Sequence, residues 1–120
     1  MQASEAKLEV VVVGGGMITH DQILPSLYHL QRIGRIGPIK ICALNSAPLA
    51  ALARSERLVE AFPGQHFESF PSLSEPPDRL FPDLFREVIA GQAAGNLVVV
   101  AVPDHLHDMV IREALAHDQH

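Results

Sequence analysis

The sequence contains few of the residues that several classes of protein require. Its single cysteine, Cys42, excludes an intrachain disulfide, and the apolar run around it at residues 39–44 predicts a small buried side chain rather than a reactive thiol. Basic residues number 9 against 14 acidic ones, and the net charge is −5. Because nucleic-acid binding generally needs a basic face, we expect no nucleic-acid partner, although backbone N–H groups can still form a local anion site.

Long apolar segments are equally scarce in the sequence. The longest clean apolar run, residues 97–102, is far shorter than the ~20 residues that a membrane span needs. Residues 1–7 show no apolar stretch typical of a signal peptide. We therefore expect no membrane association and a cytoplasmic location.

The composition that remains is that of one globular domain covering residues 1–120, with 48% apolar and 19% charged residues. Apolar runs alternate with segments of helical apolar spacing, in the first of which Pro25 should kink the helix or delay its regular start. This alternation predicts an α/β fold: a doubly wound, Rossmann-type parallel sheet of four strands in the order 3-2-1-4, flanked by helices. The predicted strands are residues 8–13, 39–44, 66–70 and 97–102, and the predicted helices are residues 17–33, 46–61, 78–90 and 105–117.

A glycine-rich turn follows the first predicted strand. Residues 14–19 (GGGMIT) fit the pattern G-x-G-x-x-G at its first two glycines, with Thr19 in place of the third. Gly14 allows a tight turn at the end of the strand, and Gly16 has no Cβ to keep a pyrophosphate from the backbone. The helix that follows offers free N–H groups and a positive dipole end. The alternative is a plain strand-to-helix turn. We predict a dinucleotide-binding turn whose contacts are Gly14, Gly16, Met17 and Ile18.

The end of the second predicted strand should lie near the adenosine ribose. NAD-binding proteins usually have Asp or Glu there to accept hydrogen bonds from the ribose hydroxyls, whereas this chain has Asn45 and Ser46. Neutral Asn45 can still bond a hydroxyl and would not repel a 2′-phosphate, but no arginine follows immediately to bind that phosphate. The pattern leaves NAD and NADP both open, with a slight preference for NADP. Alternatively, Asn45 only caps the next helix.

With VPDHLH at residues 102–107, the chain resembles the Gfo/Idh/MocA family of oxidoreductases. Residues 14–27 (GGGMITHDQILPSL), 41–53 and 97–115 (LVVVAVPDHLHDMVIREAL) carry the resemblance. It implies an NAD(P)-binding Rossmann domain of an enzyme that transfers a hydride to or from a sugar, polyol or related CH–OH group. In that family the turn after the fourth strand lies against the ribose and nicotinamide, which implies that Val102, Pro103 and Asp104 line the dinucleotide. His107 takes the position of the family's histidine, which implies a place among the cofactor-binding residues, where we expect it to order the turn rather than to transfer a proton.

The resemblance implies a domain truncated before the family's Lys-Pro motif and substrate domain. Neither Lys7 nor Lys40 matches the place of the catalytic lysine, so we assign no catalytic residue and expect a chain that is not catalytic by itself. The alternatives are a stand-alone NAD(P)-sensing module and an inactive nucleotide-binding module. A methyltransferase that binds S-adenosylmethionine also uses a glycine turn, but Asn45 disfavours it.

The histidines show no spacing typical of a metal site. His105 and His107 are two residues apart and would point away from each other on a helix, so we predict no metal.

The run at residues 97–102 has no polar alternation, which is typical of a strand buried on both faces. The order 3-2-1-4 nevertheless places it at an edge of the sheet, where its N–H and C=O groups would be unpaired. We predict that this strand pairs with another chain, giving a possible homo-oligomer, or that something else covers its edge.

Overall fold

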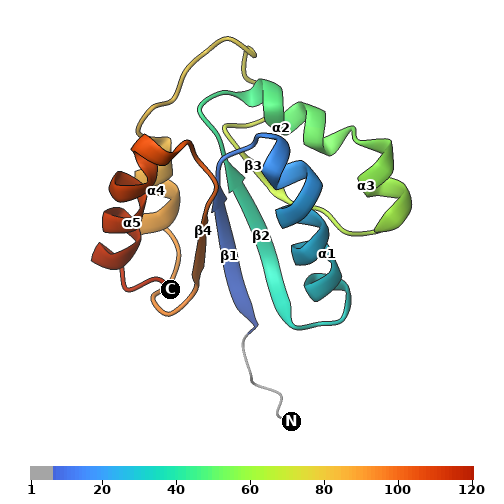
Figure 1. Cartoon of the computed structure of the whole chain (residues 1–120), viewed down its shortest axis with the longest axis horizontal. Helices are drawn as coiled ribbons and strands as arrows, with labels where there is room; N and C mark the ends of the chain where they lie inside the picture. The colour runs from blue at the N-terminus through green and yellow to red at the C-terminus, as the bar shows by residue number, and fades with distance from the viewer. Residues whose placement is uncertain (1–6) are drawn as a thin grey trace.

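The computed structural model describes residues 7–120 and contains one four-stranded sheet (Figure 1). All strand pairings are parallel and the spatial order is β3-β2-β1-β4, which confirms the predicted α/β fold and shows a Rossmann-like arrangement. The strands are β1 (Leu8–Val13), β2 (Ile36–Cys42), β3 (Glu68–Phe70) and β4 (Leu97–Val100). The helical elements are a π-helical turn η1 (Thr19–Ile23), α1 (Leu24–Arg32), α2 (Ser46–Ala53), α3 (Glu56–Ala61), α4 (Leu84–Ala90), a 3₁₀ turn η2 (Asp104–Leu106) and α5 (His107–Ala116).

Helices cover both faces of the sheet, α1 to α3 on one and α4 with α5 on the other (Figure 1). This explains the unbroken valines of β1: Val10, Val11 and Val12 are fully buried, because a central parallel strand contacts a helical layer on each side. Successive side chains point to opposite faces, so β1 contributes to two separate apolar clusters. The first includes Val10, Val12, Leu24, Ile41, Leu49 and Leu58; the second includes Val11, Val13, Cys42, Phe85, Ile89 and Val110.

The first two predicted helices are irregular in the structure. The first is helical from Met17 and contains the π-helical turn η1 directly before α1, and this wider turn accommodates Pro25, which has no N–H to donate. The predicted helix 46–61 is interrupted after Ala53, and Ser55 starts α3 by accepting a hydrogen bond from the backbone N–H of Leu58. Serine competes for backbone hydrogen bonds more effectively at a helix start than in its interior, which accounts for the break.

Other helices and strands begin or end at different residues than predicted, and the causes are again local. The second strand starts earlier than predicted, at Ile36, and accommodates Pro38 beside an irregularity in the pairing of β1 with β2. The helix predicted for residues 78–90 forms only from Leu84, after Pro82, since the residue before a proline is disfavoured in a helix. The third strand is shorter at Glu68–Phe70, the fourth ends at Val100, and the last helix follows a 3₁₀ turn.

The C-terminal residues are fixed to one end of β4. Gln119 and Gln92 are both buried, and the Gln92 side-chain amide donates to Oε1 of Gln119 at 2.7 Å. The amide of His120 donates to the carbonyl of Asn96, and the carbonyl of His120 accepts from the amide of Val98, both at 2.8 Å. The C-terminal residues therefore cover one end of the β4 edge that was predicted to be unpaired. Pairing of the rest of this edge with another chain stays a prediction.

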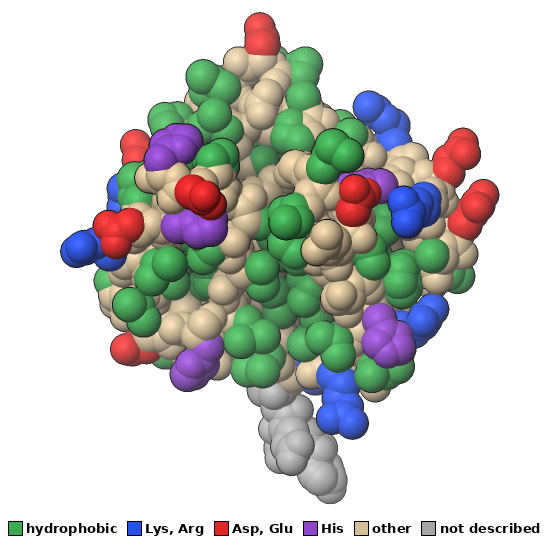
Figure 2. Space-filling model, viewed as in Figure 1, with side chains coloured by type: hydrophobic (Ala, Val, Ile, Leu, Met, Phe, Trp, Pro, Cys, Tyr) green, Lys and Arg blue, Asp and Glu red, His purple; other side chains and the backbone are tan. Residues whose placement is uncertain are grey.

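The surface of the molecule carries both apolar and charged side chains. Figure 2 shows apolar side chains toward the middle of one face and charged side chains of both signs around its margin. Within residues 7–120, no helix has the length and apolarity needed to cross a membrane.

Gly14 is the residue on which the end of β1 depends. Its φ is +125°, and a Cβ added to it would overlap the carbonyl oxygen of Ala101. Gly64 has a similar left-handed φ of +85°, but an added Cβ there meets nothing within 4 Å. The two glycines thus separate the cost of backbone strain from the cost of a steric collision.

We predict that Gly14→Ala lowers the free energy of unfolding by about 3 kcal/mol or more, because strain and collision add. The matched variant Gly64→Ala should cost only about 1–2 kcal/mol, the cost of the left-handed conformation alone. Urea denaturation of both variants measures the difference. Equal losses would contradict the close approach of Gly14 to Ala101.

Candidate functional site

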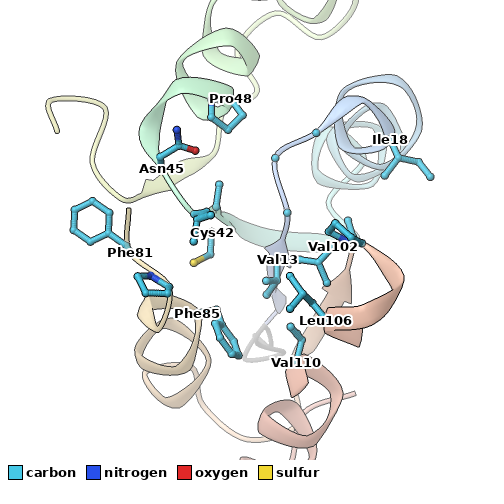
Figure 3. Close-up of a pocket in the computed structure, with 18 of the residues that line it drawn as sticks. Val13, Ile18, Cys42, Asn45, Pro48, Phe81, Phe85, Val102, Leu106 and Val110 are labelled. Carbon is cyan, nitrogen blue, oxygen red and sulfur yellow. The ribbon is translucent and has the colours of Figure 1, made fainter. Parts of the chain in front are cut away.

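A cavity of about 610 Å³ opens at the carboxyl ends of β1, β2 and β4 (Figure 3). The glycine turn forms one side, and the segment before α4, together with the start of α5, forms the other. This is where ligands bind in open α/β sheets, because the connections of β1 and β4 leave toward opposite faces. The lining residues are Val13, Gly14, Gly15, Gly16, Met17, Ile18, Cys42, Ala43, Leu44, Asn45, Pro48, Phe81, Pro82, Phe85, Ala101, Val102, Pro103, His105, Leu106, Met109 and Val110.

The glycine turn presents backbone donors to this cavity. The N–H of Gly14 donates to the carbonyl of Cys42 at 2.7 Å, whereas within residues 7–120 the N–H groups of Gly15 and Gly16 have no hydrogen-bond partner. The carbonyl of Gly16 accepts from the amide of His20, so a helical turn begins there, and its first N–H groups have no partner within the helix. The structure thus brings Gly14, Gly16, Met17 and Ile18 together at the cavity, with donors suited to an anion.

Two contacts hold the start of this helix in place. Thr19, at the third position of the glycine pattern, is fully buried, and its hydroxyl donates to the carbonyl of Gly14 at 2.8 Å. One residue later, His20 lies 2.8 Å from the hydroxyl of Ser55 through Nε2 and 2.7 Å from the carboxylate of Asp21 through Nδ1. The glycine turn is therefore tied to the beginning of α3 as well as to β1.

The opposite wall of the cavity is apolar and was not identified from the sequence. Phe81 and Phe85 line the side formed by α4 and the segment before it, and Leu106 and Val110 line the side nearest β4 (Figure 3). Pro82 also lines the cavity. The available signal was the pair Phe81-Pro82, two bulky apolar residues near the start of the predicted helix 78–90. These flat side chains suit a planar, uncharged ring better than a polar chain.

Asn45 and Ser46 both hold the segment that carries Phe81. The Asn45 side-chain amide donates to the carbonyl of Pro77 at 2.6 Å, and the Ser46 hydroxyl donates to the carbonyl of Glu75 at 2.9 Å. The amide of Phe81 donates to the carbonyl of Leu44 at 2.7 Å. Asn45 lines the cavity and has the backbone of a helix start, but its side chain makes no capping bond. Ser46 is buried and does not line the cavity.

Only some of the residues predicted to bind the cofactor in the turn after β4 line the cavity. Val102 and Pro103 line the cavity, whereas the side chain of Asp104 is fully exposed to solvent and outside the lining. His107 is also outside the lining, and its Nε2 lies 2.7 Å from the carbonyl of Val102, a distance at which the ring N–H donates. That bond orders the turn.

Titratable groups are scarce around the cavity. Of the described residues that line it, only Cys42 and His105 ionise, and burial raises the pKa of the Cys42 thiol to about 12. Within residues 7–120, no group of three or more His, Cys, Asp or Glu side chains could hold a metal ion. The site can bind through backbone donors and apolar contact, and its walls offer little acid–base chemistry.

Comparison with known proteins adds no family to this description. No family model, no curated protein and no solved structure matches the chain. The resemblance to the Gfo/Idh/MocA family therefore stays a prediction from the sequence motifs. The ligand is inferred from the geometry of the cavity.

We predict that Cys42 is unreactive in the folded chain. Because its pKa is raised from 9.0 to about 12, the thiolate population is very small near neutral pH. At about pH 8, reaction with an aromatic disulfide reagent should be roughly 100-fold slower than in the urea-unfolded chain. Equal rates would contradict the buried position of the thiol.

The same shift predicts a pH dependence of stability. Only the unfolded state ionises its thiol as the pH rises above 9.0, so the contribution of Cys42 is complete below that pH and falls as the pH approaches about 12. Cys42→Ala provides the control: the difference in urea midpoint between it and the parent chain should change only above the ordinary thiol pKa.

Proposed function

We propose that the chain binds NAD or NADP, with the pyrophosphate on residues 14–18 and one ring of the cofactor in the apolar cavity. The space beside Gly16 carries this proposal. Gly16 does not have a left-handed φ, and a Cβ built on it meets nothing within 4 Å. No contact within the described fold requires glycine at this position, whereas close approach of a phosphate to the backbone does.

The rest of the cavity fits the remainder of such a ligand. Its volume of about 610 Å³ lies within the roughly 300–1,000 Å³ of small-molecule sites. Phe81 and Phe85 offer apolar surface to a ring, and the N–H groups of Gly15 and Gly16 offer donors to phosphate oxygens. Oδ1 of Asn45 is available to accept a hydrogen bond from a ribose hydroxyl, since only the amide nitrogen is used to hold Pro77.

The wider role that we propose is the cofactor-binding part of an oxidoreductase acting on a sugar, polyol or related CH–OH group. This class comes from the resemblance of residues 14–27 and 97–115 to the Gfo/Idh/MocA family. The cofactor would supply hydride transfer, and this chain would bind and orient it. The scarcity of titratable groups around the cavity supports a binding role, and we assign no catalytic residue. A cytoplasmic location accompanies this proposal.

S-adenosylmethionine is the main competing ligand, because methyltransferases also place a glycine turn after their first strand. Its only anionic group is one carboxylate, so it would offer fewer anionic oxygens to the unpaired N–H groups of Gly15 and Gly16 than a pyrophosphate does. The donors at the turn therefore favour a dinucleotide.

We predict that Gly16→Val abolishes dinucleotide binding while the chain stays folded. The added Cβ and methyl groups would occupy the approach of the phosphates and weaken binding by roughly 100-fold or more. Open space around the site should limit the loss of stability to about 1 kcal/mol. Isothermal titration calorimetry with NAD, NADP and S-adenosylmethionine measures binding, and urea denaturation measures stability.

Gly16→Ala is the graded control and should weaken binding less than valine does. A folded Gly16→Val variant that binds a dinucleotide as tightly as the parent would show that the phosphates lie elsewhere. A parent chain that binds S-adenosylmethionine but neither dinucleotide would refute the proposed function.

We also predict that Asn45→Asp lowers the affinity for NADP relative to NAD by about tenfold, because a carboxylate repels the 2′-phosphate and accepts from a ribose hydroxyl. The substitution also removes the bond to Pro77, which should weaken both ligands alike. The ratio of the two dissociation constants, obtained by calorimetry, isolates the charge effect. An unchanged ratio would place the ribose away from Asn45.

A further inference from the structure

The segment that directly follows β2 offers no cation to a phosphate on the adenosine ribose. The first basic residue after Asn45 is Arg54, which lies just beyond the last turn of α2. At about 1.5 Å per helical residue, the length of α2 separates the two by roughly 12 Å. A cation for a 2′-phosphate beside Asn45 therefore has to come from another part of the chain.

The segment before α4 brings a cation to the end of β2. Hydrogen bonds fasten this segment on both sides of Arg79: the carbonyl of Pro77 accepts from the side-chain amide of Asn45 at 2.6 Å, and the amide of Phe81 donates to the carbonyl of Leu44 at 2.7 Å. The Cα of Arg79 is two residues from Pro77 and from Phe81, so it lies within about 7 Å of both Cα atoms. An arginine side chain starting there can reach the surroundings of Asn45.

The guanidinium of Arg79 lies against the cavity wall on the side of Asn45. Its Cζ is 5.0 Å from the centroid of the Phe81 ring, and Phe81 lines the cavity. Figure 3 shows Phe81 and Asn45 on the same side of the cavity, away from Val102. The Arg79 side chain is outside the lining and 63% exposed, so it is free to change its direction. A base packed on Phe81 would place its ribose between Asn45 and this guanidinium.

The carboxylate of Glu75 is the present partner of Arg79. Nη1 of Arg79 lies 3.2 Å from Oε1 of Glu75 in a pair that is largely open to solvent. Exposed pairs of this kind stabilise a protein little, whereas a phosphate offers a guanidinium more charge and more acceptor oxygens. Glu75 holds the segment through its backbone carbonyl, which accepts from the Ser46 hydroxyl. Its carboxylate can therefore be changed without releasing the segment.

We infer that Arg79 binds the 2′-phosphate of NADP and that the chain prefers NADP to NAD. This inference rests on the proposed function and assigns the choice of cofactor to the segment before α4. Arg79 exchanges Glu75 for the phosphate, to which its planar guanidinium donates a forked pair of hydrogen bonds. Oδ1 of Asn45, which is not used to hold Pro77, accepts from the remaining hydroxyl of the same ribose.

The inference is tested by isothermal titration calorimetry of the full 120-residue chain with NADP and NAD at one ionic strength. The parent chain should bind NADP more tightly. Arg79→Gln should lower the affinity for NADP by about tenfold and change that for NAD by less than about twofold. Arg54→Gln is the matched control, because it removes the same charge from an exposed position beyond the far end of α2 and should leave the ratio of affinities unchanged.

Two further variants separate charge from structure. Glu75→Gln removes the competing carboxylate and should raise the affinity for NADP by about threefold, with little effect on NAD. Arg79→Lys keeps the charge but loses the forked geometry, so it should retain part of the preference for NADP.

A parent chain that binds NAD as tightly as NADP would overturn this inference and leave the proposed function standing. So would an Arg79→Gln variant whose ratio of affinities equals that of Arg54→Gln. A parent chain that binds neither dinucleotide would overturn both. If urea denaturation shows that Arg79→Gln disturbs the fold, Glu75→Gln decides, and a fall in its affinity for NADP would contradict the role of Arg79.

Discussion

The architecture depends on the contact between backbones where β1 ends between its two neighbours. The amide of Gly14 donates to the carbonyl of Cys42 in β2, and its Cα lies so close to the carbonyl of Ala101, just beyond β4, that no side chain fits between them. The carboxyl ends of β1, β2 and β4 are thereby held together. The glycine turn then leaves toward one face of the sheet and the chain after β4 toward the other, and the cavity opens between them.

One wall of that cavity is held by the same residues that end β2. Hydrogen bonds from Asn45, Ser46 and the amide of Phe81 fasten the segment before α4 across the strand ends, and this places Phe81 and Phe85 against the cavity. A position expected to contact the ribose therefore also supports the apolar wall. Any change at Asn45 acts on both, which is why a ratio of affinities is more informative there than either affinity.

Backbone hydrogen bonding also organises the far edge of the sheet. The buried pair of Gln92 and Gln119 fixes the last residues, so that His120 pairs with Asn96 and Val98, while His107 engages the carbonyl of Val102. A parallel strand at an edge leaves every second residue without partners. Here the chain satisfies some of these groups itself, through His120 and His107.

The strand order and the glycine turn could be predicted from the sequence, because alternation of apolar runs, valines in β1 and glycines after it are local signals with few structural solutions. The break at Ser55 and the late start of α4 at Leu84 have local causes, a serine cap and Pro82, that the apolar spacing alone did not reveal. The wall formed by Phe81 and Phe85 could not be predicted, because it depends on hydrogen bonds between residues far apart in the chain, such as Asn45 with Pro77. Those partners come within hydrogen-bonding distance only once the sheet has assembled, so the local spacing of apolar residues in the sequence does not predict them.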